Sequence, residues 1–86
     1  MQFLVEIKFN QALTDEMIAL LPAETARGKE LDAAGSRLAL YLAADMSAAW
    51  QVYQAESLAE VQEMVDSFPL TRFITATIIP LQPAAI

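Results

Sequence analysis

Residues 36–55, SRLALYLAADMSAAWQVYQA, hold two mostly apolar runs separated by a short polar break, and this stretch decides the fold. The alternation of side chains predicts strands over residues 36–44 and 48–55. Only the three residues 45–47 lie between them, so the two strands are expected to form an antiparallel hairpin.

Alternation also predicts which side chains share a face of each strand. In the first strand, Leu38, Leu40 and Leu42 are expected on one face and Arg37, Ala39, Tyr41 and Ala43 on the other. In the second strand, Trp50 and Val52 oppose Ala49, Gln51 and Tyr53. One face of each strand should therefore pack on a core.

A strand and a helix precede this hairpin. Residues 2–9 alternate strictly and predict a half-buried strand. Thr14 can cap a following helix, but Pro22 lacks an N–H and crowds the preceding turn. We therefore expect a broken helix over residues 14–34 that ends at Gly35, a residue suited to the left-handed position after a helix.

A helix and a strand follow the hairpin. Ser57 and Glu60 have the spacing of a capping box, and an apolar stripe continues to Phe68 before Pro69 stops the helix. Residues 72–79 predict the last strand. Two prolines then follow, so residues 81–86 are expected to be an apolar tail outside the sheet.

This order of elements predicts a single α+β domain over residues 1–86, with a ferredoxin-like βαββαβ fold and a four-stranded antiparallel sheet. Two helices can cover only one face of such a sheet. The other face still carries apolar side chains, and 56% of the chain is hydrophobic. Because a small domain rarely leaves a large apolar patch in water, we expect at least a homodimer.

Composition excludes several classes of function. Five basic against eleven acidic residues give a net charge of −6, which disfavours nucleic acid and anionic membrane surfaces as partners. The chain has no cysteine and no histidine, so thiolate or imidazole metal sites and histidine acid–base chemistry are excluded. No signal peptide or membrane-spanning run is recognised, and a cytoplasmic location is expected.

Several motifs together resemble the muconolactone delta-isomerase family over essentially the whole chain. They are Gly35 at the start of a strand, the Ser57 helix, Phe68-Pro69-Leu70 after it, and the exit Pro80-Leu81-Gln82-Pro83, with Glu24 and Leu31 resembling the family's first helix. The resemblance implies that the sheets of two subunits pair face to face as a dimeric α/β barrel. It also implies an isomerase of aromatic catabolism that moves a double bond in an unsaturated lactone by proton transfer, without metal or organic cofactor.

The second face of the sheet carries both polar and apolar residues, and Glu6, Lys8, Tyr41 and Tyr53 are expected on it. Glu6 is the candidate general base, because burial inside a barrel would raise its pKa; a simple ion pair with Lys8 or Arg37 is the alternative. The candidate substrate-binding residues are Leu4, Lys8, Tyr41, Trp50 and Tyr53. For Trp50 core packing is the alternative, and for the tyrosines an interface with wet hydroxyls.

The other charged residues are interpreted as solvated surface. Glu24, Arg27, Lys29 and Glu30 are expected to form a mixed-charge helix face exposed to water.

Three functions remain open. The first is a small-molecule isomerase or lyase acting on an unsaturated lactone or related small organic acid through a carboxylate. The second is a non-catalytic barrel kept for ligand binding or assembly, and the third is a cofactor-free barrel monooxygenase. An enclosed pocket that holds a carboxylate favours the first, and a filled, dry barrel favours the second.

Overall fold

The computed structural model describes residues 1–84 of the chain. The strands are β1 (Gln2–Phe9), β2 (Arg37–Leu42), β3 (Ala48–Gln54) and β4 (Ile74–Leu81), and the helices are α1 (Asp15–Ala33) and α2 (Leu58–Asp66), with a short 3₁₀ turn at Thr71–Phe73. The sheet has the order β2-β3-β1-β4 with antiparallel neighbours throughout. This is the predicted ferredoxin-like arrangement, and that prediction is confirmed.

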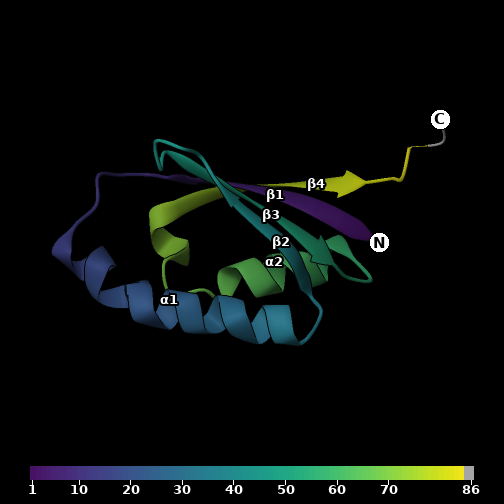
Figure 1. The fold of residues 1–86 in the computed structure, drawn as a ribbon, viewed down its shortest axis with the longest axis horizontal. Helices are drawn as coiled ribbons and strands as arrows, with labels where there is room; N and C mark the ends of the chain where they lie inside the picture. Colours follow the sequence, from purple (N-terminus) through teal and green to yellow (C-terminus); the bar gives the residue numbers. More distant parts are fainter. Residues whose placement is uncertain (85–86) are drawn as a thin grey trace.

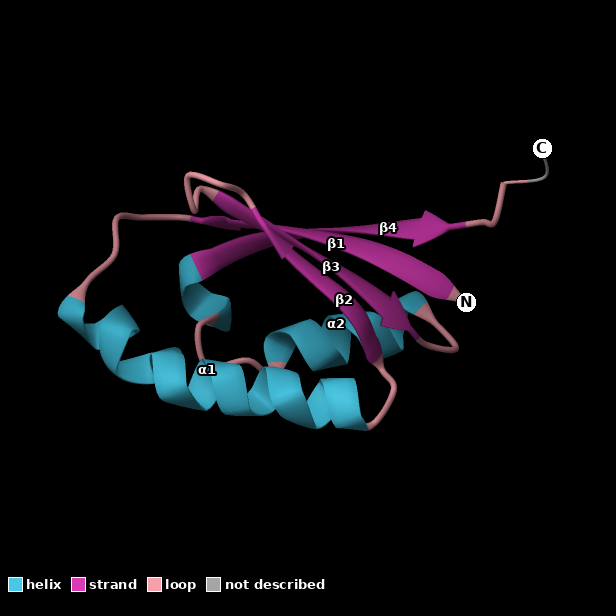
Figure 2. Ribbon diagram, in the orientation of Figure 1, coloured by secondary structure: helices cyan, strands magenta, loops and turns pink. Residues whose placement is uncertain are grey.

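Both helices lie on one side of the sheet, and the other side is uncovered (Figures 1 and 2). The core forms between the helices and the sheet, around the fully buried side chains of Phe3, Val5, Tyr53 and Val61. The sheet thus has two faces. We call the one that packs against α1 and α2 the helix face, and the uncovered one the open face.

The ends of the helices follow the predicted local signals. Thr14 accepts a hydrogen bond from the Met17 N–H, and Ser57 accepts one from the Glu60 N–H. At the end of α1, Gly35 has φ +77°. Its N–H donates to the Asp32 carbonyl and the Ser36 N–H to the Leu31 carbonyl, which is the double hydrogen bond of a Schellman motif.

Two of the three predictions based on proline are wrong, whereas α2 ends before Pro69 as predicted. α1 runs without interruption past Pro22, and Figure 1 shows its first turns at an angle to the longer part. The last strand continues through Pro80 to Leu81. β4 is an edge strand, and a proline is accepted there because its missing N–H can face away from the neighbouring strand. Residues 82–84 lead away from the sheet, and the rest of the expected tail lies outside the described residues.

An irregularity in β2 corrects one predicted face. Arg37 pairs with Tyr53 and Ala39 with Val52, so the register shifts at Leu38. Because one extra residue reverses the side on which a strand residue points, Arg37 lies on the helix face and not beside Tyr41.

The open face is lined by side chains from all four strands. They include Leu4, Glu6, Lys8, Ala39, Tyr41, Ala48, Trp50, Val52, Thr75, Thr77 and Ile79. Tyr41 is 65% exposed and Ile79 44% exposed. This face is therefore largely apolar and uncovered in the single chain.

Candidate functional site

The predicted site residues divide between the two faces of the sheet. The register pairs Glu6 with Trp50 on the open face, with Leu4, Lys8 and Tyr41 on the same side. Tyr53 pairs with Phe3 and is fully buried on the helix face. The prediction that Tyr53 shares the face of Glu6 is wrong, because the register of β1 against β3 pairs Glu6 with Trp50, and Tyr53 lies on the opposite side of β3 from Trp50, as predicted.

Glu6 has polar partners on the open face. Its Oε2 accepts a hydrogen bond from Trp50 Nε1 at 3.2 Å, and its Oε1 lies 3.8 Å from Lys8 Nζ. The structure thus contains the Lys8 ion pair that was the alternative for Glu6, and Trp50 lies beside it instead of in the core. Glu6 and the other open-face candidates lie on the far side of the sheet from the partly open cavity described next.

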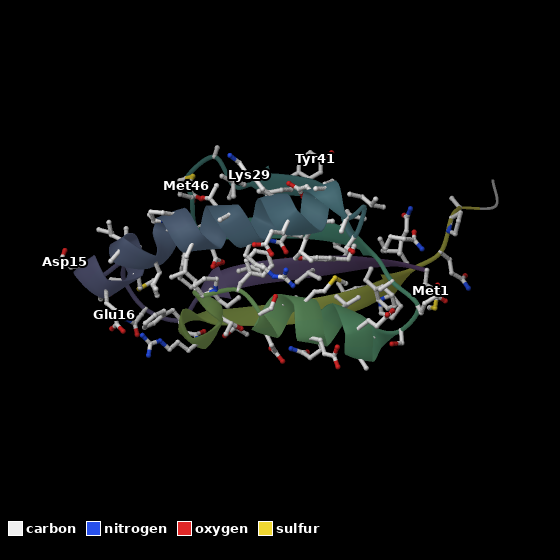
Figure 3. The ribbon with its side chains drawn as sticks, turned by 90° about the horizontal axis from the view of Figure 1, so that it is seen from below. Met1, Asp15, Glu16, Lys29, Tyr41 and Met46 are labelled. Carbon is white, nitrogen blue, oxygen red and sulfur yellow. The ribbon has the colours of Figure 1, made fainter. Side chains whose placement is uncertain are left out.

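A cavity of about 350 Å³ lies between α1 and the helix face of the sheet. Its apolar lining includes Ile7, Phe9, Leu40, Leu42, Met46, Val65, Phe68, Leu70 and Ile74, and its polar lining consists of Glu24, Thr25, Lys29, Asp32, Arg37 and Gln51. Figure 3 shows Lys29 of α1 and Met46 of the β2–β3 turn along the same edge of the molecule as Tyr41. A cavity of this volume is within the range that holds small organic ligands.

Glu24 is the half-buried carboxylate of this cavity. α1 presents it between Met17, Gly28 and Leu31, the buried residues of the helix. Its Oε2 accepts a hydrogen bond of 3.0 Å from the Leu70 N–H. Desolvation by burial raises the pKa of Glu24, and the Leu70 N–H and the nearby Arg37 charge offset this in part. The interpretation of Glu24 as solvated surface is therefore wrong.

Arg37 is the buried cation of the cavity. Its Nε donates to Asp32 Oδ1 at 2.7 Å and its Nη2 to Asp32 Oδ2 at 3.1 Å. This paired hydrogen bond lowers the pKa of Asp32. The guanidinium also lies against α1 at Gly28, where a Cβ atom would stand 2.5 Å from Nη2. Glycine at position 28 thus leaves the space that Arg37 occupies.

Gln51 and Tyr53 supply the polar part of the sheet beneath the cavity. The Tyr53 hydroxyl donates to Oε1 of Gln51, and both residues are buried. Burial raises the pKa of Tyr53 to about 12. The phenol therefore keeps its proton at neutral pH and remains a hydrogen-bond donor.

Within residues 1–84 no group of three potential ligands is placed to hold a metal ion. The same residues include no helix that is both long and apolar enough to cross a membrane.

Sequence reasoning missed Glu24, Arg37 and Gln51. A signal for Glu24 was present, because Met17, Glu24, Gly28 and Leu31 follow helical spacing and put a carboxylate on the buried stripe of α1. For Arg37 and Gln51 the deciding facts are the shift at Leu38 and the pairing of β3 with β1.

The chain is thus a ferredoxin-like α+β domain whose cavity has the size of a small molecule and contains a carboxylate. The chain belongs to the muconolactone delta-isomerase family, whose model matches residues 1–84. The predicted resemblance is thereby confirmed.

Two solved structures share the fold. One is a muconolactone isomerase, with a TM-score of 0.86 and 17% sequence identity over 99% of this chain and 92% of that chain. The other is 5-chloro-2-hydroxyhydroquinone dehydrochlorinase from Burkholderia phenoliruptrix AC1100 in complex with 2,5-dihydroxybenzoquinone, with a TM-score of 0.78 and 21% identity over 98% and 96%. None of the curated proteins compared with the chain matches it.

Proposed function

We propose that this protein is a cofactor-free isomerase that moves a double bond in an unsaturated lactone or a related small organic acid, with Glu24 transferring the proton. The observation that carries the proposal is the half-buried Glu24 carboxylate in a mostly apolar cavity. Membership in the muconolactone delta-isomerase family supports the reaction class.

The reaction needs one base and no redox partner. In an unsaturated lactone, the carbon γ to the carbonyl loses a proton to a carboxylate, and its electron pair delocalises through the double bond onto the carbonyl oxygen. Return of the proton at the α carbon leaves the double bond one position along, so atoms and charge balance. A carboxylate with a raised pKa is the stronger base for this step, and Glu24 has that property.

Two basic and two acidic residues line the cavity, and Arg37 is paired with Asp32, so Lys29 is the residue that supports an anionic substrate. An organic acid bound there would gain a charge-assisted hydrogen bond from Lys29.

Turnover of muconolactone by two matched variants tests the proposal. Glu24→Gln keeps an oxygen for the Leu70 N–H but removes the base, and a lost general base costs ~10²–10⁴-fold in rate. Glu6→Gln makes the same change on the open face and is expected to keep most of the activity.

The opposite result, with loss in Glu6→Gln alone, would move the site to the open face and restore the sequence prediction for Glu6. A folded wild-type protein that binds muconolactone without turnover would favour the non-catalytic binding barrel.

The same proposal includes self-association through the open face, as in a dimeric α/β barrel, together with a cytoplasmic location and a role in the breakdown of aromatic compounds. The uncovered apolar side chains support the first part, and the family supports the last.

A further inference from the structure

Gln51 is unusual among residues 1–84, because it is the one buried residue with a carboxamide side chain. It lies on β3, paired with Val5 of β1 and Leu40 of β2, which are both apolar. A buried carboxamide costs free energy unless it forms hydrogen bonds. The Gln51 carboxamide therefore needs hydrogen-bond partners, either within the fold or in a ligand.

One end of the Gln51 carboxamide has a partner within the fold. The Tyr53 hydroxyl donates to Oε1, which turns the amide nitrogen Nε2 toward the other side. Among the described residues no fully buried side-chain nitrogen or oxygen lacks a partner, and Gln51 lines the cavity. These observations fit an amide nitrogen that is accessible from the cavity, where its two N–H groups are donors for a ligand.

We propose that Gln51 is a catalytic hydrogen-bond donor to the carbonyl oxygen of the substrate, and that Tyr53 is the positioning residue that orients it. This inference rests on the proposed function. Gln51 reaches the cavity from the sheet and Glu24 from α1, so the two groups approach a bound ligand from different elements. The substrate class is accordingly a lactone or acid whose carbonyl is conjugated with the migrating double bond.

The step explains why a donor is needed at this place. When Glu24 takes the γ proton, negative charge develops on the carbonyl oxygen, and a donor fixed in advance stabilises that charge with no cost of reorientation. The hydrogen bond from Tyr53 supplies the fixing, because it holds the carboxamide in one of its two orientations.

Binding of two unreactive probes separates this inference from the proposed function. The first probe is muconolactone with its ring double bond saturated, and the second is the matching cyclic ether acid without the carbonyl oxygen. One hydrogen bond contributes about 1 kcal/mol, so calorimetry of the wild-type protein is expected to show roughly fivefold to tenfold tighter binding of the lactone. Gln51→Met should abolish this preference.

Kinetics on muconolactone provide the second readout. Loss of one oxyanion donor typically lowers kcat ~10²–10³-fold, and this is expected for Gln51→Met with little change in KM. Tyr53→Phe should lower kcat less, because the amide can still reach the substrate when it is no longer held. Gln62→Met, the same substitution at an exposed glutamine of α2, is the matched control and should leave the binding of both probes and kcat unchanged.

Gln51→Met leaves the Tyr53 hydroxyl unpaired and is at risk of folding poorly. A double variant keeps the test valid in that case. Gln51→Met with Tyr53→Phe removes both partners and should fold better, and its kcat should equal that of Gln51→Met alone. A wild-type protein that turns over muconolactone but binds both probes equally overturns the inference and leaves the proposed function standing. A preference for the lactone without turnover supports Gln51 as the donor and overturns the proposed reaction. A wild-type protein that shows neither the preference for the lactone nor turnover of muconolactone overturns both the inference and the proposed function.

Discussion

Replacing Gly28 by alanine should leave this protein equally or more stable and yet change the pH dependence of its activity. The new Cβ would stand 2.5 Å from Arg37 Nη2 and 3.0 Å from its Cζ. The guanidinium is the far end of a flexible side chain, so it must move away by nearly an ångström to reach ordinary contact. The helix itself benefits, because alanine is more favourable than glycine in a helix interior by about 1 kcal/mol.

The cost to stability is small by comparison. Displacing Arg37 weakens its pair with Asp32, whose side chain is 49% exposed, and such pairs contribute about 0–1 kcal/mol. The net change in the free energy of unfolding is expected between about 0 and +1 kcal/mol. For a domain of this size, that corresponds to a rise in Tm of up to roughly 8 °C.

The effect on activity comes through Glu24. The charge of Arg37 lowers the pKa of Glu24 against the effect of burial, so a displaced Arg37 leaves this pKa higher still. As a base, Glu24 acts only when deprotonated. The fall of kcat/KM on the acid side should therefore begin at a higher pH in Gly28→Ala than in the wild type.

The assay combines urea denaturation with the pH profile of kcat/KM on muconolactone. Ala26→Gly is the matched control, because it makes the reverse change at an exposed position of α1 and should lower stability by about 1 kcal/mol with an unchanged pH profile. Gly28→Ala with a Tm below that of the wild type and an unshifted acid limb would refute this account of Arg37.

Three further changes address the helix end, the acid side of stability and the open face. Gly35→Ala should lose ~1–2 kcal/mol in urea denaturation, because φ +77° is strained for alanine; an equal midpoint would contradict the Schellman motif. The pKa of Asp32 is lowered in the fold, so its contribution is present above its unfolded pKa and is lost as pH falls through the folded value; the stability gap between wild type and Asp32→Asn should close on acidification, and a constant gap would count against it. Ile79→Asp should shift sedimentation toward monomer, whereas Ile18→Asp, at a similarly exposed isoleucine of α1, should not; equal behaviour of the two would dismiss the open face as the interface.

The fold could be predicted from the sequence because its signals are local. Alternation in residues 2–9 and 48–55, together with the caps at Thr14 and Ser57, states both the type and the order of the elements. Pro22 and Pro80 misled the prediction for a common reason. Proline removes one N–H, and both a helix anchored by packing and an edge strand can lose that donor without ending.

The site could not be predicted in the same way because it depends on which faces meet. Glu24 belongs to a helix and Glu6 to a strand, and only the register of β1 against β3 shows that Glu6 lies on the side of the sheet away from the helices. The shift at Leu38 has a similar effect, since it carries Arg37 to the side of Glu24.

The hydrogen bond from the Leu70 N–H to Glu24 makes one backbone amide a reporter of the reaction. An N–H holds a charged carboxylate more strongly than a neutral acid. The amide proton of Leu70 should therefore change its chemical shift each time Glu24 gains or loses its proton. A single resonance followed by NMR would then report the titration of the base during turnover, without any label on the substrate.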